Sequence, residues 1–420
     1  MYDIIIIGGG AAGLMAAISA QQYGAKKILL LERMATVGRK LRITGKGRCN
    51  VTNIAPIEDF PKYFPGNGRF LYSALRQFTN QDLIAFFEEH HVPLKTERGG
   101  RIFPVSDQAG DIIAALAQTL TTATTVLPNM RVRRLLIEEG RIAGVEIWSG
   151  KQYHSTNVIL ATGGASYPAT GSSGDGYDLA KAAGHSLLPL HPALVPLEVE
   201  ELSVVKDLQG LSLRNVSAQI WLGGRKVAEE FGEMLFTHFG LTGPIILSLS
   251  AQLAKHWKEN ADVSDTFIKI NLKPALDEEV LDKRLQRDFQ KFTRKQLKNA
   301  LSELLPSTMI PVVIDLAFLD PDKPVNQITK EERQRILEQL LGLTFTITRP
   351  RPLAEAIVTA GGIHVKEVNP KTMESRLVPG LYLAGEVLDI DAYTGGFNLQ
   401  AAFSTGYVAG KSAAEKLQSE

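Results

Sequence analysis

Three short, largely apolar runs, each followed by glycine at once or after one residue, are the clearest pattern along this chain. They are Ile4 to Ile7, Asn157 to Ala161 and Leu381 to Ala384. Unbroken apolar runs of this length are typical of parallel strands buried on both faces of a sheet. The first and last runs each lead into a segment with helical spacing. Because both strands must be buried, we expect them to share one sheet that is built from both ends of the chain.

The pattern between these runs predicts the remaining elements. We expect helices over 71–90, 111–121 and 177–183, a hairpin over 92–104, and strands over 131–138 and 141–148. From about residue 190 short alternating segments indicate an antiparallel barrel or sandwich, and 277–335 is helical and highly charged. The predicted fold class is α/β, a discontinuous Rossmann-like domain with an inserted antiparallel β-barrel-like domain that carries a small helical insert. The expected limits are 1–190 with 355–420, 191–275 with 336–354, and 276–335.

Composition narrows the classes of protein without choosing a function. The chain has 420 residues, 44% hydrophobic and 22% charged, with a formal charge of +1, so no whole-molecule field draws nucleic acid or membrane. The single cysteine, Cys49, excludes an intrachain disulfide and favours a reducing compartment. No signal-peptide pattern or spanning apolar stretch is visible, so we expect a cytoplasmic protein that does not contact membrane. No metal site is predicted.

The first glycine segment has the spacing of a dinucleotide-binding turn. Gly8 would make the tight turn, Gly10 would let a pyrophosphate approach the backbone, and Gly13 would let helix and strand pack closely. The pyrophosphate would then lie on the positive end of the helix. Glu32 ends the second strand and would accept hydrogen bonds from ribose hydroxyls. This motif predicts nucleotide binding and leaves FAD and NAD open.

Later segments repeat the strand-and-glycine pattern. The stretch from Val37 to Asn50 is rich in glycine and in basic residues. We expect a long loop that contacts phosphates; the alternative is a solvated loop without this role. Thr162-Gly163-Gly164 follows the middle strand. Gly395-Gly396 opens the last helix, whose N–H groups at Asn398 and Leu399 would stabilise the negative charge of a reduced flavin. The alternative is a simple N-cap turn.

The motifs together resemble a known family. GRKLRITGKGRCNVTN (38–53), THFGLTGP (237–244), TAGG (359–362) and GGFNLQ (395–400) are similar to those of the BaiN/RdsA family of NAD(P)/FAD-dependent oxidoreductases, within the two-dinucleotide-binding-domain flavoproteins. One departure is Phe397, where Tyr is usual. The resemblance implies non-covalent FAD on a Rossmann-like FAD-binding domain. With the turns above it gives these cofactor-binding residues: Gly8, Gly10, Ala11, Ala12, Gly13, Glu32, Arg33, Arg39, Lys40, Thr44, Gly45, Asn50, Val132, Ala161, Thr162, Gly163, Gly385, Glu386, Asp389, Gly395, Gly396, Asn398 and Leu399.

The same resemblance implies the kind of reaction but leaves the substrate open. Family activities include reduction of conjugated C=C bonds in bile-acid intermediates, reduction of a ribosomal RNA uridine to dihydrouridine, and oxidation of aminoacetone. We predict an FAD-dependent oxidoreductase in which NAD(P)H-reduced flavin reduces an electron-poor C=C bond of a small molecule or nucleobase. An oxidase of a small amine and a non-enzymatic flavin-binding module are the alternatives. Only one GxGxxG fingerprint is present, so no separate NAD(P)H domain is expected.

Two residues are candidates for the catalytic proton donor, and one segment for RNA contact. Cys49 lies in the glycine-rich loop and His238 in THFGLTGP, with Tyr393 a weaker third. A buried apolar cysteine and a structural histidine are the alternatives. Lys283 to Lys298 contains seven basic residues and one acid, a concentration that suits an RNA backbone or, equally, a solvated helical face.

Overall fold

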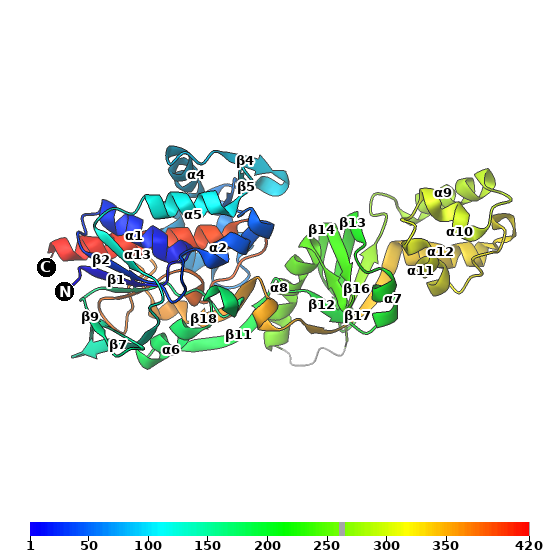
Figure 1. Cartoon of the computed structure of the whole chain (residues 1–420). Helices are drawn as coiled ribbons and strands as arrows, with labels where there is room; N and C mark the ends of the chain where they lie inside the picture. The colour runs from blue at the N-terminus through cyan, green and yellow to red at the C-terminus, as the bar shows by residue number, and fades with distance from the viewer. Residues whose placement is uncertain (260–264, 420) are drawn as a thin grey trace. The chain divides into compact units, whose positions relative to one another are not determined.

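The chain folds into two units, one of which contains both chain ends. The computed structural model describes residues 1–259 and 265–419 (Figure 1). The first unit combines Met1–Ala193 with Leu353–Glu420, and the second is Leu194–Pro352. The helical segment expected at 276–335 belongs to the second unit.

A parallel sheet forms the core of the first unit, as the apolar runs predict. Its strand order is β19-β10-β1-β2-β6, and every neighbouring pair is parallel. The strands are β1 (Ile4–Ile7), β2 (Ile28–Leu31), β6 (Thr124–Leu127), β10 (Val158–Leu160) and β19 (Leu381–Leu383). All residues of β1, β2, β10 and β19 are buried, which explains their continuous apolar sequence. The predicted fold class is confirmed, with strands from both chain ends in one sheet.

Two helices from opposite ends of the chain pack closely together in this unit. They are α1 (Ala11–Gln22) and α13 (Phe397–Ser419), which Figure 1 shows side by side. A Cβ on Gly406 would lie 2.2 Å from the carbonyl oxygen of Ala12, and one on Gly410 2.1 Å from that of Ala16. The helices can therefore approach only because these positions lack side chains.

Smaller elements complete the first unit. The antiparallel sheets are β7-β8-β9, β3-β5-β4 and β11-β18. Their strands are β3 (Thr52–Asn53), β4 (Leu94–Glu97), β5 (Arg101–Pro104), β7 (Val132–Glu138), β8 (Arg141–Ile147), β9 (Gln152–His154), β11 (Leu187–Ala193) and β18 (Val358–Ile363). The predicted hairpin over 92–104 is confirmed as β4 and β5, and α5 (Ala109–Gln118) and α6 (Asp175–Ala182) lie where helices were expected.

Two predictions about local structure in this unit were wrong. The helix expected over 71–90 is two helices, α3 (Tyr72–Gln77) and α4 (Asn80–Glu89), because Thr79 and Asp82 form a capping box that starts a new helix. The stretch 37–50 is not simply a loop, since it contains α2 (Arg39–Ile43) and a 3-10 turn at Thr44–Gly47. Helical spacing alone cannot locate a cap inside a run.

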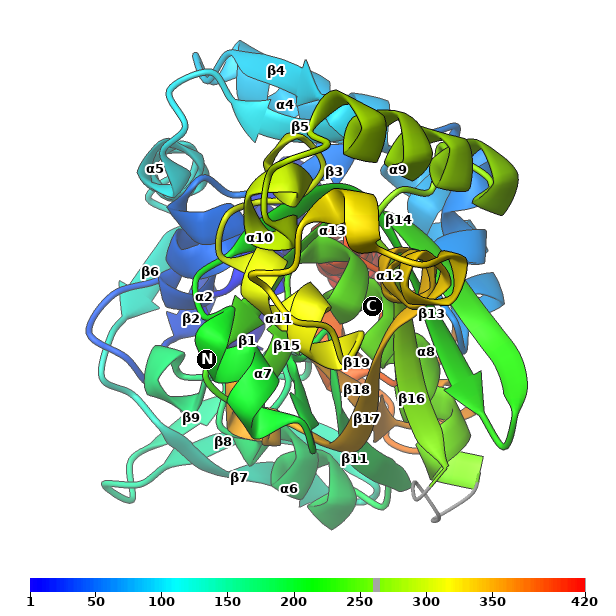
Figure 2. The same ribbon diagram turned by 90° about the vertical axis from the view of Figure 1, so that its right-hand side faces the viewer.

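The second unit is a closed antiparallel barrel that carries a group of helices. The barrel order is β12-β15-β14-β13-β16-β17. Its strands are β12 (Leu197–Val199), β13 (Ser212–Leu222), β14 (Arg225–Thr237), β15 (Gly240–Thr242), β16 (Thr266–Asn271) and β17 (Leu343–Pro350). The helices are α7 (Leu202–Asp207), α8 (Pro244–Glu259), α9 (Glu278–Lys291), α10 (Leu297–Ala300), α11 (Met309–Leu316) and α12 (Lys330–Gly342). In Figure 1 helices α9 to α12 gather at one end of the barrel, and Figure 2 shows them from that end.

One hydrophobic core runs through barrel and helices. Buried residues of the strands, such as Ile268 and Phe345, belong to the same cluster as Leu285 of α9 and Leu337 of α12. The helical group is therefore stabilised by the barrel core. No helix among residues 1–259 and 265–419 is long and apolar enough to cross a membrane.

Candidate functional site

The turn between β1 and α1 has the backbone that a dinucleotide needs. Gly8 has a φ of +105°, and a Cβ there would lie 2.5 Å from the carbonyl oxygen of Ala161. A Cβ on Gly13 would lie 1.9 Å from the carbonyl oxygen of Gly8. Around Gly10, by contrast, a Cβ would meet nothing within 4 Å, and no side chain caps α1 there. The backbone is therefore tightly packed at Gly8 and Gly13, whereas there is free space beside Gly10 at the start of the helix.

Glu32 holds this turn from the end of β2. Its Oε2 accepts a hydrogen bond from the Gly9 N–H at 2.8 Å, and its Oε1 accepts from the Met34 N–H at 2.7 Å. The side chain is 8% exposed. A carboxylate has about four acceptor positions, so ribose hydroxyls can still bind it.

The turn after β10 lies beside the first one. Ala161 is next to Gly8, and the hydroxyl of Thr162 is buried without a hydrogen-bond partner among the described residues. Gly163 has a φ of +73°, and a Cβ there would lie 2.7 Å from Ser172 Oγ. The strand order changes direction between β1 and β10, and ligands of such sheets bind outside the strand carboxyl ends at this switch point.

An ion pair joins α2 to the turn after β19. Lys40 Nζ lies 2.7 Å from Glu386 Oε2 and donates to Ser166 Oγ at 2.7 Å. Glu386 Oε1 accepts from the backbone N–H of Thr359 at 2.9 Å. A Cβ on Gly385 would lie 2.9 Å from the Cβ of Ala12, so this turn also reaches the start of α1. Four segments far apart in sequence thus meet at one edge of the sheet.

The glycines that open α13 are clamped by the GRCN segment and β3. Asn53 Nδ2 donates to the carbonyl oxygen of Gly395 at 3.0 Å. With its amide in the orientation that satisfies both ends, the Asn50 oxygen accepts from the Gly396 N–H at 3.0 Å. A Cβ on Gly396 would lie 2.3 Å from the carbonyl oxygen of Thr52. The two most specific motifs of the sequence are therefore parts of one contact.

The side chain of Asn398 binds the backbone of Ala392. Its Oδ1 accepts from the Ala392 N–H at 2.8 Å, and its Nδ2 donates to the Ala392 carbonyl at 2.9 Å. It fixes the loop that precedes α13. The expected contribution of the backbone N–H groups at Asn398 and Leu399 stays a prediction.

The other expected cofactor residues make varied contacts within the first unit. Arg33 pairs with Asp175 at 2.9 Å and also bonds to Ser173. Arg39 is exposed and makes no ion pair or hydrogen bond within the described part of the chain. Thr44 Oγ1 donates to the Leu41 carbonyl, and Gly45 adopts a φ of +56°. Val132 is buried at the start of β7, and Asp389 accepts a hydrogen bond from Asn67 Nδ2 at 2.7 Å.

The two candidate proton donors lie in different units. The Cys49 side chain is fully buried, and burial raises the pKa of its thiol to about 12. Its surroundings therefore favour the alternative of a small buried apolar residue. His238 is exposed in the turn between β14 and β15, against the ring of Phe239.

The basic segment of the helical insert is partly neutralised by neighbouring acids, with four carboxylates for its seven cations. Five of its seven cations have carboxylate partners within 4.0 Å, and the pairs are Lys283 with Glu279, Arg284 and Arg287 with Asp288, Lys291 with Glu303, and Lys298 with Asp322. Three of these four acids lie outside 283–298, so the sequence count of one acid underestimated the pairing. Arg294 and Lys295 have no carboxylate partner among the described residues.

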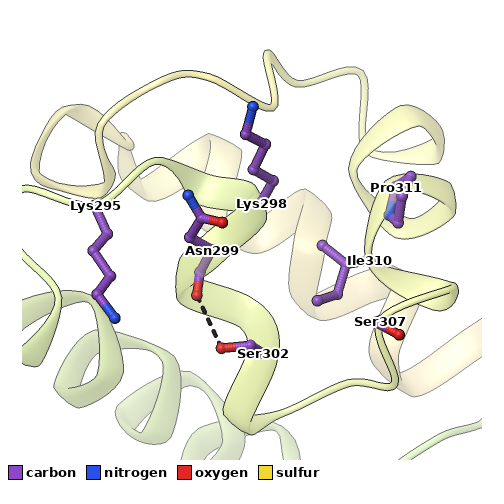
Figure 3. Close-up of a pocket in the computed structure, with 7 residues that line it drawn as sticks. All are labelled: Lys295, Lys298, Asn299, Ser302, Ser307, Ile310 and Pro311. Carbon is purple, nitrogen blue, oxygen red and sulfur yellow. Dashed lines mark hydrogen bonds between the residues drawn. The ribbon is translucent and has the colours of Figure 1, made fainter.

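A hollow of about 650 Å³ lies beside this segment (Figure 3). It is lined by Lys295, Lys298, Asn299, Ser302, Ser307, Ile310 and Pro311. In Figure 3 the amino ends of Lys295 and Lys298 point in opposite directions, and Ser302 donates to the Asn299 carbonyl at 3.0 Å. The side chains do not converge on a common point, so the hollow is not shaped to enclose one small anion.

The residues of the first unit fit an FAD cofactor. Gly10 leaves open space at an uncapped helix start, as a pyrophosphate requires, and the unpartnered buried hydroxyl of Thr162 lies at the same sheet edge. The sequence did not single out three further residues: Asn53, which binds the turn that opens α13, and Ser166 and Thr359, which bind Lys40 and Glu386. Asn53 and Thr359 lie in the quoted motifs, which could have drawn attention to them.

Comparison with known proteins finds relatives over nearly the full length. The chain is 33% identical over 419 residues to 3-dehydro-bile acid delta(4,6)-reductase of Clostridium scindens, covering 99% of this chain and 100% of that protein. It is 30% identical over 406 residues to the ribosomal RNA dihydrouridine synthase of Escherichia coli, covering 97% and 96%. The solved 3-ketosteroid delta1-dehydrogenase from Sterolibacterium denitrificans shares the fold, with a TM-score of 0.50 and 13% identity over 99% of each chain.

A parallel dinucleotide-binding sheet made from both chain ends, an open glycine turn and an inserted barrel define an FAD-dependent oxidoreductase. The family model described as HI0933-like protein Rossmann domain matches residues 2–412. The chain belongs to this family, which confirms the resemblance found in the sequence.

Proposed function

We propose that this enzyme reduces an electron-poor C=C bond, in a conjugated enone or in the uracil ring of a ribosomal RNA uridine. The observation that carries the proposal is the near-full-length similarity to a delta(4,6)-reductase and to a dihydrouridine synthase. Both names describe saturation of a C=C bond conjugated with a carbonyl. Neither relative is an amine oxidase, so the oxidase alternative is not favoured.

The glycine turns described above would hold the cofactor. Gly8 to Gly13 and the start of α1 would bind the pyrophosphate, and Glu32 the adenosine ribose. Gly385, Glu386 and the turn at Gly395-Gly396 would line the remainder. FAD, once reduced by its electron donor, would supply the two electrons, and the chain would contribute orientation and a proton.

The reaction requires a hydride at one alkene carbon and a proton at the other. Cys49 and His238 remain our candidates for the proton, or for a hydrogen bond to the substrate carbonyl. The exposed imidazole of His238 is better suited than the buried Cys49 thiol. We expect His238→Ala to lower turnover at least 100-fold with unchanged FAD content, and Cys49→Ala to be close to wild type. Wild-type turnover in both variants would remove both candidates.

NAD(P)H is our proposed electron donor, and anaerobic reduction of the purified protein tests it. The 450-nm flavin band should bleach on addition of NADH or NADPH. Dithionite provides the control that the flavin can be reduced at all. A flavin that dithionite bleaches and neither nicotinamide does would require another donor.

The acceptor is tested by reoxidation of the reduced enzyme. The arms are a 3-oxo-4,6-diene steroid acid and protein-free ribosomal RNA. A separate assay gives aminoacetone and oxygen to the oxidised enzyme, because aminoacetone would donate electrons to the flavin. Saturated steroid or dihydrouridine, detected by mass spectrometry, supports the proposal. Rapid peroxide formation with aminoacetone, and no saturated product, would contradict it. Action on ribosomal RNA would also agree with a cytoplasmic location.

A further inference from the structure

An exposed strip of tyrosines and cations lies on the first unit, close to the start of α13. The strip consists of Lys62, Tyr63, Arg69, Tyr72 and Arg76, all of which are exposed. We propose that it binds single-stranded RNA, with the Tyr63 ring as the surface on which a base stacks. This inference rests on the proposed function, since it selects RNA as the substrate class.

Tyr63 presents an aromatic face that is already fixed in place. Its ring stacks on Phe397, with centroids 4.0 Å apart and planes 10° apart. Phe397 is 3% exposed, whereas Tyr63 is 36% exposed, so the outer side of the stack meets solvent. Phe60 packs edge-on against Phe397 from the interior. A base that stacks on Tyr63 would continue an ordered column at little entropic cost.

The remaining residues of the strip share one helical face. Arg69, Tyr72 and Arg76 follow at spacings of three and four, through the 3-10 turn Gly68–Leu71 into α3. Neither arginine makes an ion pair or hydrogen bond within the described part of the chain. Both guanidinium groups are therefore available to phosphates.

Lys62 interacts electrostatically with both tyrosines of the strip. Its ammonium pairs with Asp59, which raises the Lys62 pKa, and the phenols of Tyr63 and Tyr72 add smaller contributions in the same direction. Both phenols thus lie near one cation. The strip has three cations and one paired acid, whereas the insert has four acids paired with five of its seven cations.

The strip is tied to the segment that leads into the proposed flavin site. The Tyr63 carbonyl accepts from the Tyr393 N–H at 2.9 Å, and Asn67 Nδ2 donates to the Asp389 carbonyl at 2.9 Å. A base on Tyr63 would therefore lie beside the Gly395-Gly396 turn. Alternating aromatic side chains and cations are typical of proteins that bind single-stranded nucleic acid. Each base can stack on an aromatic ring, and each phosphate carries a negative charge that a cation can bind.

Binding of a fluorescein-labelled, uridine-rich 12-nucleotide RNA to the FAD-loaded protein tests the strip. Fluorescence anisotropy should show Tyr63→Ala weakening binding about 10-fold, and Tyr63→Phe restoring it, because stacking needs the ring. The double variant Arg69→Gln with Arg76→Gln should lower the magnitude of the slope of log K against log salt by about 1.4. This is the change expected when two phosphate contacts to a single strand are lost, at about 0.7 each. Unchanged FAD content and melting temperature show that the variants fold.

Two controls come from the second unit. Phe318→Ala removes a ring that is 84% exposed but has no place in the strip, and should bind RNA as wild type does. Arg294→Gln with Lys295→Gln removes the unpaired cations of the insert. A large loss in this insert variant, with wild-type binding by Tyr63→Ala, overturns the proposal.

Failure of the RNA-binding proposal can be distinguished from failure of the proposed C=C reduction. A wild type that reduces the steroid dienone but binds no RNA overturns the strip and leaves C=C reduction standing. A wild type whose RNA binding depends on the strip, but which reduces no acceptor, supports the strip and overturns the proposed function. Binding to intact ribosomal subunits but not to protein-free ribosomal RNA would assign the strip to a protein partner and overturn the proposal.

Discussion

Lys40 Nζ lies 2.7 Å from Glu386 Oε2, although the two residues are 346 positions apart in the chain. The pair links α2 to the turn that follows β19, the last strand of the parallel sheet. Ser166 and Thr359 complete the contact from two further segments. The site is thus held by charge as well as by strand pairing.

Breaking this pair should cost stability. The two side chains are 24% and 20% exposed, so solvent screens the pair only in part. We expect Glu386→Gln to lower the free energy of unfolding by about 1 kcal/mol, measured by urea denaturation of the FAD-free protein. A double-mutant cycle with Lys40→Met isolates the pair. Lys283→Met, which breaks a pair exposed by 69% and 79%, should change little.

Gly10 and Gly13 should respond to alanine in opposite ways. Gly13→Ala places a Cβ 1.9 Å from the Gly8 carbonyl oxygen, so we expect it to destabilise the fold by about 1–3 kcal/mol. Gly10→Ala meets no protein atom within 4 Å and should leave the melting temperature of FAD-free protein unchanged. It should nevertheless weaken FAD binding at least 10-fold, because the methyl group occupies the pyrophosphate approach. Wild-type FAD affinity in Gly10→Ala would place the pyrophosphate elsewhere.

Asn53 should be needed to hold the α13 turn. The residue is 4% exposed and donates to the carbonyls of Gly99 and Gly395. Asn53→Ala leaves both acceptors unsatisfied, at a cost of about 1–3 kcal/mol, and we expect faster FAD release. Stopped-flow fluorescence of released flavin measures this. Asn299→Ala on the insert is the control and should release FAD at the wild-type rate.

Cys49 should make stability depend on alkaline pH. Its pKa is raised from 9.0 to about 12 by burial, so the folded state keeps its proton where the unfolded state loses it. Unfolding then releases a proton, and stability falls as pH rises from about 9 to about 12. Denaturation between pH 8 and 10.5 should show this slope in wild type and a smaller one in Cys49→Ala. Rapid labelling of native Cys49 by a thiol reagent at pH 8 would contradict its burial.

The sequence alone determined the parallel sheet, the barrel and the family. Strands buried on both faces must be continuously apolar. Glycine is required where two backbone segments approach so closely that a Cβ would clash. Both constraints act on single residues or short segments, so they can be recognised in the sequence at Ile4 to Ile7, Gly8 and Gly13. Thr79 shows the limit, since its capping box was hidden within a run of helical spacing.

The tertiary structure decided which charges are free and which motifs touch. Acids that pair with the insert, such as Glu303 and Asp322, come from outside its basic segment, so charge counted along the sequence missed part of the pairing. Asn50 and Gly396 meet across about 350 residues, and Tyr63 stacks on Phe397 from a segment without a clear pattern. Pairing energy depends on distance in space, and sequence spacing reports that distance only within one helix or strand.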